Sequence, residues 1–124
     1  MSNKLAIRTA AFLGLMAVAL GAFGAHALKA TLAANQTTAI WEKAVFYHFI
    51  HTVMLFVLAS RPRFLRGPWF AFLAGVIIFS GTLYALALTN LKWLGAITPL
   101  GGLSFMIGWI WLIAAAPAFR EDRR

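Results

Sequence analysis

The chain has 124 residues, of which 62% are hydrophobic and only 11% are charged, and its mean hydropathy is +0.82. Soluble domains are only about half apolar, so this composition excludes an ordinary soluble protein and predicts an integral membrane protein. The absence of cysteine excludes disulfides and thiolate metal sites. The net charge of +8 comes from short basic clusters between apolar runs, which favours lipid headgroups over nucleic acid as the partner.

The first apolar run extends from Thr9 to Leu28 and follows two basic residues, Lys4 and Arg8. At about 1.5 Å per residue, a helix of ~20 residues reaches about 30 Å, which is enough to cross the hydrocarbon core. Small side chains recur along this run at alternating spacings of four and three residues. Such a stripe lets another helix approach closely, so we expect the first helix to be the central, protein-covered one. The stripe consists of Ala10, Gly14, Ala17, Gly21, Gly24 and Leu28.

The connection after this run, residues 29–40, is polar and small, which predicts a turn with a short interfacial helix over residues 29–34. Asn35 or Thr38 is suited to cap the helix that follows. The second span is expected over residues 41–60. Its first half carries the polar side chains Tyr47, His48 and His51.

The basic, proline-containing segment 61–68 ends the second span and starts the third, which is expected over residues 69–89. A short turn then leads to a fourth span over residues 96–116. The third span carries Ser80 and Tyr84, and Thr98 lies in the first turn of the fourth. We expect the glycines of the spans to serve in helix packing, namely Gly14, Gly21, Gly24, Gly75, Gly101, Gly102 and Gly108.

Four spans with short connections predict a single domain, residues 1–124, folded as an all-α, up-down-up-down bundle of transmembrane helices. Cytoplasmic segments carry the excess of Lys and Arg, so the basic residues orient the bundle. Eight of them fall on one side and three, Lys29, Lys43 and Lys92, on the other. Both termini are therefore expected in the cytoplasm. The eight are Lys4, Arg8, Arg61, Arg63, Arg66, Arg120, Arg123 and Arg124.

This orientation brings polar side chains from all four helices into the outer half of the bundle and leaves the inner half almost purely apolar. From the helical rise, His26 is expected about 3 Å inside the outer boundary and His51 about 10 to 15 Å deep. Intramembrane histidines usually face inward and mark a site, although one near a helix end can instead donate to a free carbonyl. His48 is expected to face the headgroups. The expected cluster consists of His26, Tyr47, His51, Ser80, Tyr84 and Thr98.

The residue types disfavour several chemistries. A metal site needs three or four converging ligands, and the candidates are only His26, His48 and His51, with Glu42 at a different angle around its helix, so no metal is expected. No haem or other cofactor is expected, because His26 and His51 differ in depth by about 10 Å. A proton-coupled exporter of cations needs an acidic residue inside the membrane, and none is available. No nucleophile with a base and an orienting carboxylate is visible, so we do not expect an enzyme.

Four segments along the chain resemble a single family: ALGAFGAHAL (Ala19 to Leu28), YHFIH, FSGTLYALAL (Phe79 to Leu88) and TPLGGLSFMIGW (Thr98 to Trp109). This is the uncharacterised bacterial inner-membrane family known as domain of unknown function 423, and the resemblance covers nearly the whole chain. It implies a four-helix protein of the bacterial plasma membrane with no established activity. His48 stands where a glutamine is expected, which favours His26 with His51 as a pair. The resemblance supports His26, Tyr47, His51, Ser80, Tyr84, Thr98 and Pro99 as motif positions.

We therefore expect a small non-enzymatic membrane protein whose outer polar cluster binds a lipid headgroup or a partner helix. The alternative is a transport or channel-like module in which the histidines line a proton or solute path. The segments 53–59 and 105–116 carry no ionisable group, which places this alternative second, and a scaffold for other membrane proteins is a third reading. Expected partners are membrane lipids, with anionic headgroups at the cytoplasmic face, and a second copy or another membrane protein, but no nucleic acid.

Overall fold

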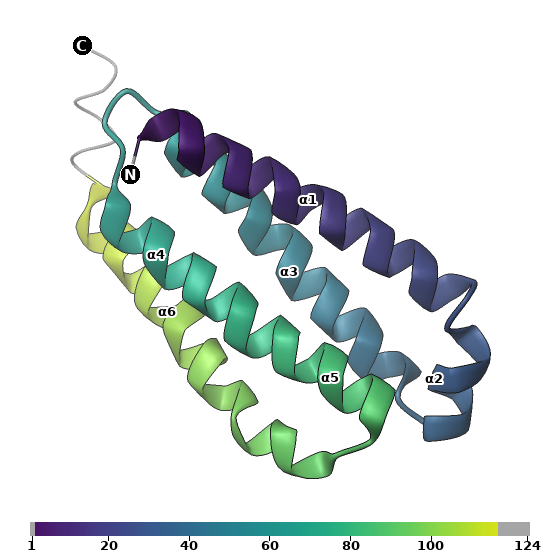
Figure 1. The fold of residues 1–124 in the computed structure, drawn as a ribbon. Helices are drawn as coiled ribbons and strands as arrows, with labels where there is room; N and C mark the ends of the chain where they lie inside the picture. The colour runs from purple at the N-terminus through teal and green to yellow at the C-terminus, as the bar shows by residue number, and fades with distance from the viewer. Residues whose placement is uncertain (1, 117–124) are drawn as a thin grey trace.

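The computed structural model describes residues 2–116, which fold into helices without any strand (Figure 1). Four stretches are long and apolar enough to cross a membrane: Asn3–Ala25, Thr38–Ala59, Arg66–Thr89 and Lys92–Ala114. This confirms the all-α, four-span fold. The elements in chain order are α1 (Asn3–Ala25), α2 (Lys29–Asn35), α3 (Thr38–Ala59), α4 (Arg66–Gly75), the π-helical turn η1 (Val76–Ser80), α5 (Gly81–Thr89), the 3-10 turn η2 (Lys92–Ala96) and α6 (Thr98–Ala114).

The first helix begins and ends earlier than the apolar run from Thr9 to Leu28. Its start is fixed by Ser2, whose side chain accepts a hydrogen bond from the N–H of Leu5, as expected of an N-cap serine. The basic residues Lys4 and Arg8 therefore lie on α1 itself. The helix ends at Ala25, so His26 is the residue after it and not part of its last turn.

The central helix is α3, not α1. Helix α1 packs along one side of α3, the third span (α4, η1 and α5) packs along another side, and α6 lies against the third span (Figure 1). The expectation of a protein-covered first helix is thus wrong, since α1 has the smallest buried share of the four spans and exposes Phe12, Leu15 and Val18. A stripe of small residues needs only one neighbour, and the remainder of such a helix is free to face lipid.

The small-residue stripe of α1 forms the seam with α3. The two helices run antiparallel, with Gly14 opposite Thr52 and Gly21 opposite Val45. At Gly24 a Cβ would collide with the indole of Trp41, whose Nε1 donates to the Leu20 carbonyl across 2.9 Å. The glycines therefore bring the two backbones close enough for an α3 side chain to bond with the α1 backbone.

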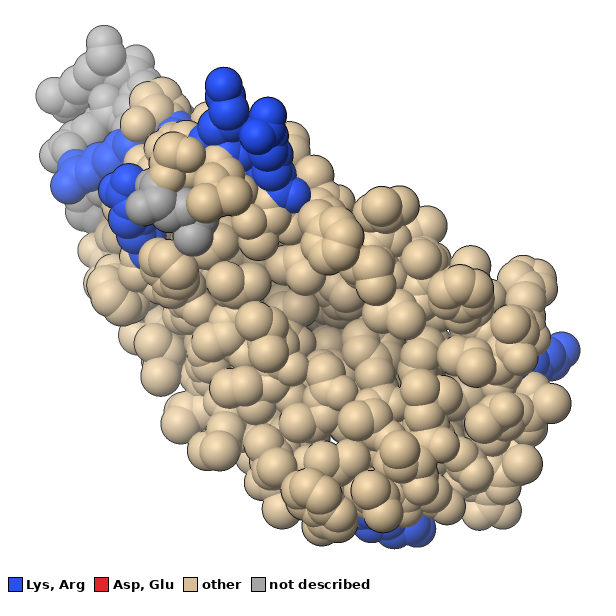
Figure 2. All heavy atoms as spheres, in the orientation of Figure 1, with Lys and Arg blue, Asp and Glu red and all other residues tan. Residues whose placement is uncertain are grey.

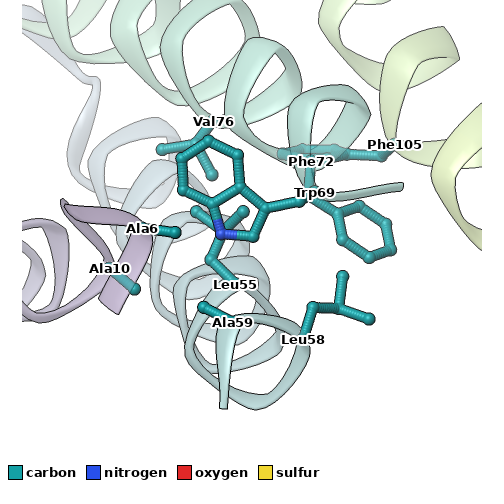
Figure 3. Packing of buried hydrophobic residues seen from close by; sticks show 9 residues of the cluster. All are labelled: Ala6, Ala10, Leu55, Leu58, Ala59, Trp69, Phe72, Val76 and Phe105. Carbon is teal, nitrogen blue, oxygen red and sulfur yellow. The ribbon is translucent and has the colours of Figure 1, made fainter. Parts of the chain in front are cut away.

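One end of the bundle is held by an apolar core around Trp69, the indole of which inserts from α4 between α1 and α3 (Figure 3). Trp69 and Phe72 are completely buried, and small alanines on the facing helices make room for the large rings. Burying a large apolar side chain stabilises the fold by about 1.5 to 3 kcal/mol in water, whereas in lipid the gain comes from packing. The remaining members of this core are Ala6, Ala10, Leu55, Leu58, Ala59, Val76 and Phe105.

At the opposite end, α2 covers the ends of α3 and α5. Asn35 Nδ2 and Thr37 Oγ1 both donate to the Ala87 carbonyl in the last turn of α5, across 3.0 and 2.8 Å. These side chains satisfy a carbonyl that the end of α5 leaves free. Neither Asn35 nor Thr38 caps α3, because Thr37 occupies the N-cap position and makes no side-chain cap hydrogen bond.

The third span is continuous but contains one π-helical turn, Val76–Ser80, which separates α4 from α5. Helix α6 passes close to this turn: a Cβ at Gly101 would fall on the backbone of Phe79. Gly75 and Gly108 likewise make room for the rings of Phe105 and Phe72. Among the expected packing glycines, Gly14, Gly21 and Gly102 stand at ordinary contact distances from their neighbours, so a methyl group there has more room.

Positive charge gathers at the end of the bundle where α1 begins and α3 meets α4 (Figure 2). This end holds Lys4, Arg8, Arg61, Arg63 and Arg66, whereas the opposite end holds Lys29, Lys43 and Lys92. The tail residues Arg120, Arg123 and Arg124 lie outside the described residues.

Candidate functional site

The polar side chains that the sequence places in one half of the bundle form separate pairs. Among them, His48 is buried and its Nδ1 lies 2.8 Å from the hydroxyl of Tyr84, which joins α3 to α5. The Tyr84 ring packs on Trp41 at 4.8 Å between centroids. The expectation that His48 faces the headgroups is therefore not met, since the side chain turns into the bundle and only 4% of it is exposed.

His51 is held on both ring nitrogens. An indole N–H can only donate, so the 3.0 Å bond from Trp109 Nε1 makes His51 Nε2 the acceptor. The proton of the ring then lies on Nδ1, which donates to the Tyr47 carbonyl across 2.8 Å. The ring also stacks on Phe105 at 3.7 Å between centroids. His51 is thus a neutral, fully bonded side chain that joins α3 to α6.

Hydroxyl groups connect the helices in the same region. Ser80 Oγ, at the end of the π-helical turn, donates to the Ala44 carbonyl of α3 across 2.8 Å. Thr82 Oγ1 lies 2.6 Å from the Ile78 carbonyl and forms a hydrogen bond of 2.7 Å with the hydroxyl of Thr98. These contacts satisfy backbone carbonyls beside the π-helical turn and join the third span to α6.

The side chains of His26 and Tyr47 form no hydrogen bond with these pairs among the described residues, although the Tyr47 carbonyl accepts from His51. The side chain of His26 is exposed after the end of α1, and within residues 2–116 it has no hydrogen-bond partner. Tyr47 packs its ring on Phe79 at 4.7 Å and is 37% exposed. The pairing of His26 with His51 is therefore not observed. The sequence did not predict that Trp41, Thr37 and Trp109 form hydrogen bonds between helices. The only signal for any of them is that tryptophan favours the membrane interface.

Three buried polar atoms have no hydrogen-bond partner within the described part of the chain: His48 Nε2, Thr52 Oγ1 and Trp69 Nε1. His48 and Thr52 lie one turn apart on α3. No three His, Asp or Glu side chains among residues 2–116 lie close enough to share a metal ion.

A groove of about 460 Å³ lies between α1 and α3, beneath α2. The groove exists because its α1 side is lined by small residues, whereas Phe46 and Phe49 project from α3 on its other side. Its lining is almost entirely apolar, and Thr38 and Glu42 contribute the polar groups. We call it the α1–α3 groove. Its lining consists of Gly21, Gly24, Ala25, Leu32, Thr38, Trp41, Glu42, Val45, Phe46, Phe49 and Ile50.

Comparison with known proteins identifies similar chains in bacteria. Residues 20–102, which include the whole lining of the groove, match the family described as "Protein of unknown function (DUF423)". The chain is 42% identical over 120 residues to the UPF0382 membrane protein YwdK of Bacillus subtilis, an alignment that covers 91% of this chain and 96% of the relative. It is 43% identical to the UPF0382 membrane protein SAB0533 of Staphylococcus aureus, with 94% and 98% covered. No solved structure matches.

Proposed function

The chain belongs to the DUF423 family of unknown function, as its four motif segments predict, and from its geometry we propose that it is a non-enzymatic protein that binds a membrane lipid in the α1–α3 groove. The observation that carries this proposal is the groove itself. Ligand sites commonly measure about 300 to 1,000 Å³, and this groove, at about 460 Å³, lies within that range. Its apolar lining suits an acyl chain.

The groove lies at the end of the spans opposite the basic cluster. We propose that the basic end faces the cytoplasm and contacts anionic headgroups, with both termini on that side of a bacterial plasma membrane. The groove then opens to the outer leaflet. Because α1 and α3 are both exposed to lipid on this side, a chain from the bilayer can enter between them without crossing the protein.

The polar pairs support a bracing role more than a binding role. His51 has both ring nitrogens bonded within the chain, and Ser80 and Tyr84 also bond neighbouring helices. These three residues of the expected polar cluster thus already have partners within the chain. For the same reason a transport path through the histidines has less support, since His51 would have to give up two bonds to pass a proton.

Native mass spectrometry of the full chain, extracted from bacterial membranes in mild detergent, tests the proposal. Wild type is expected to retain one lipid. Ala25→Trp places an indole in the groove and should abolish the retention, because Ala25 lines the groove. Ala22→Trp is the matched control, since Ala22 is also exposed on α1 but is not part of the lining. Equal retention by the two variants would contradict the proposal.

A further inference from the structure

Glu42 is the one acidic residue within the described part of the chain, and it lies in the lining of the α1–α3 groove. Its carboxylate forms no ion pair or hydrogen bond with any residue between 2 and 116. This is unexpected in a protein with a net charge of +8, because basic residues are available on the same end. Glu42 lies in the second turn of α3, near the end of the span, and its exposed carboxylate is available to a ligand in the groove.

The position of Glu42 on α3 explains why the chain supplies no partner. Lys43 is the next residue, but successive residues on a helix point about 100° apart, and Lys43 is not part of the lining. Lys29 is the first residue of α2, one turn before Leu32, which does line the groove. The groove therefore has one carboxylate in its lining, and the helix that covers it carries one ammonium group, on the same face as Leu32.

This inference rests on the proposed function and adds the class of ligand. We propose that the groove selects a phospholipid with a primary amine in its headgroup, as in phosphatidylethanolamine. The acyl chain lies along the apolar lining, the ammonium group donates to the Glu42 carboxylate, and the phosphate lies on the side of Lys29.

The chemistry of the carboxylate distinguishes this headgroup from the alternatives. A primary ammonium carries N–H donors and forms charge-assisted hydrogen bonds with a carboxylate, whereas the quaternary ammonium of a choline headgroup has no N–H. An anionic glycerol headgroup brings a negative charge toward Glu42 without a compensating cation. A groove that bound lipid through its acyl chain alone would not distinguish the three.

The experiment is a competition in native mass spectrometry. Delipidated full-length protein is mixed with phosphatidylethanolamine, phosphatidylcholine and phosphatidylglycerol that carry identical acyl chains. Wild type is expected to prefer the ethanolamine lipid over the choline lipid by about tenfold, since a hydrogen bond to a charged group contributes enough for that ratio. Glu42→Gln should reduce this preference to about twofold or less, while Lys43→Gln, its neighbour outside the lining, should leave the preference unchanged.

The outcomes separate this inference from the proposed function. If wild type binds lipid in a manner that Ala25→Trp abolishes, but shows no preference for the ethanolamine lipid, the headgroup assignment is wrong and the groove proposal stands. A preference that persists in Glu42→Gln also overturns the assignment. If no lipid of any class binds in a manner that depends on Ala25, both the assignment and the proposed function are wrong.

Discussion

The indole of Trp109 donates a hydrogen bond to Nε2 of His51 across 3.0 Å and thereby joins α6 directly to the central helix α3. The remainder of α6 packs mainly on the third span, so this bond and the stacking of His51 on Phe105 are specific side-chain contacts between α3 and α6. It also fixes the ring proton of His51 on Nδ1, where the Tyr47 carbonyl accepts it.

Replacing Trp109 with phenylalanine tests this bond. Trp109→Phe keeps an aromatic ring but leaves His51 Nε2 without a donor. We expect a loss of about 0.6 kcal/mol of stability, the average for interhelical hydrogen bonds in a membrane protein, and at most about 1.7 kcal/mol, the largest value measured there. Unfolding by SDS titration from mixed micelles measures the change. Trp93→Phe is the control, because Trp93 is 62% exposed and has no such bond. Equal losses in the two variants would show that the bond contributes nothing.

Gly101 and Gly102 provide a test of the approach between α6 and the π-helical turn. Gly101→Ala should prevent normal packing or cost about 1 to 3 kcal/mol or more, because its methyl group meets the backbone of Phe79, which cannot rotate away. Gly102→Ala should be tolerated, since the nearest atom to its methyl group, on the Phe79 ring, lies 3.8 Å away. The yield of monodisperse protein and the unfolding midpoint report the difference. Similar behaviour of both variants would contradict the observed helix spacing.

Replacing Thr52, unlike the substitutions above, is not expected to lower stability. Thr52→Val keeps the shape and removes a buried hydroxyl that has no hydrogen-bond partner among residues 2–116, so we expect stability to be unchanged or to rise by up to about 1 kcal/mol. Ser80→Ala, at a similarly buried position, removes a hydroxyl that is bonded to Ala44 and should lower stability by about 0.6 kcal/mol. A clear loss of stability in Thr52→Val would show that this hydroxyl has a partner.

Orientation is testable because the chain contains no cysteine, so a single introduced thiol is unambiguous. Ala33→Cys, exposed on α2, should react with a membrane-impermeant maleimide in intact bacterial protoplasts. Ser60→Cys, exposed after α3, should react only after the membrane is permeabilised. The reverse pattern would place the groove in the cytoplasmic leaflet and would overturn the proposed topology.

The sequence alone predicted the number of spans well, because each is a long, largely apolar run between polar turns. It also identified the small-residue face of α1. It could not identify the partner of that face, since Gly14 and Gly21 show that a helix comes close but not which one. The expectation that this stripe makes α1 the central helix failed for this reason.

The candidate site was harder to predict, because depth in the membrane says nothing about direction around a helix. His48 and Tyr84 meet because their helices happen to face each other, and no spacing along the chain encodes that pairing. His26 is exposed and does not pack within the bundle, because α1 ends at Ala25. Helix ends are the least certain feature of a sequence prediction. The groove depends on the placement of α2, a seven-residue helix.

The dependence of α1 on α3 has a consequence for how the protein is made. Helix α1 is synthesised before α3, yet the face formed by its glycines packs on α3. Until residues 38–59 have been inserted, that face has lipid as its neighbour. A chain arrested before that point is therefore expected to hold α1 in the membrane without its packing partner.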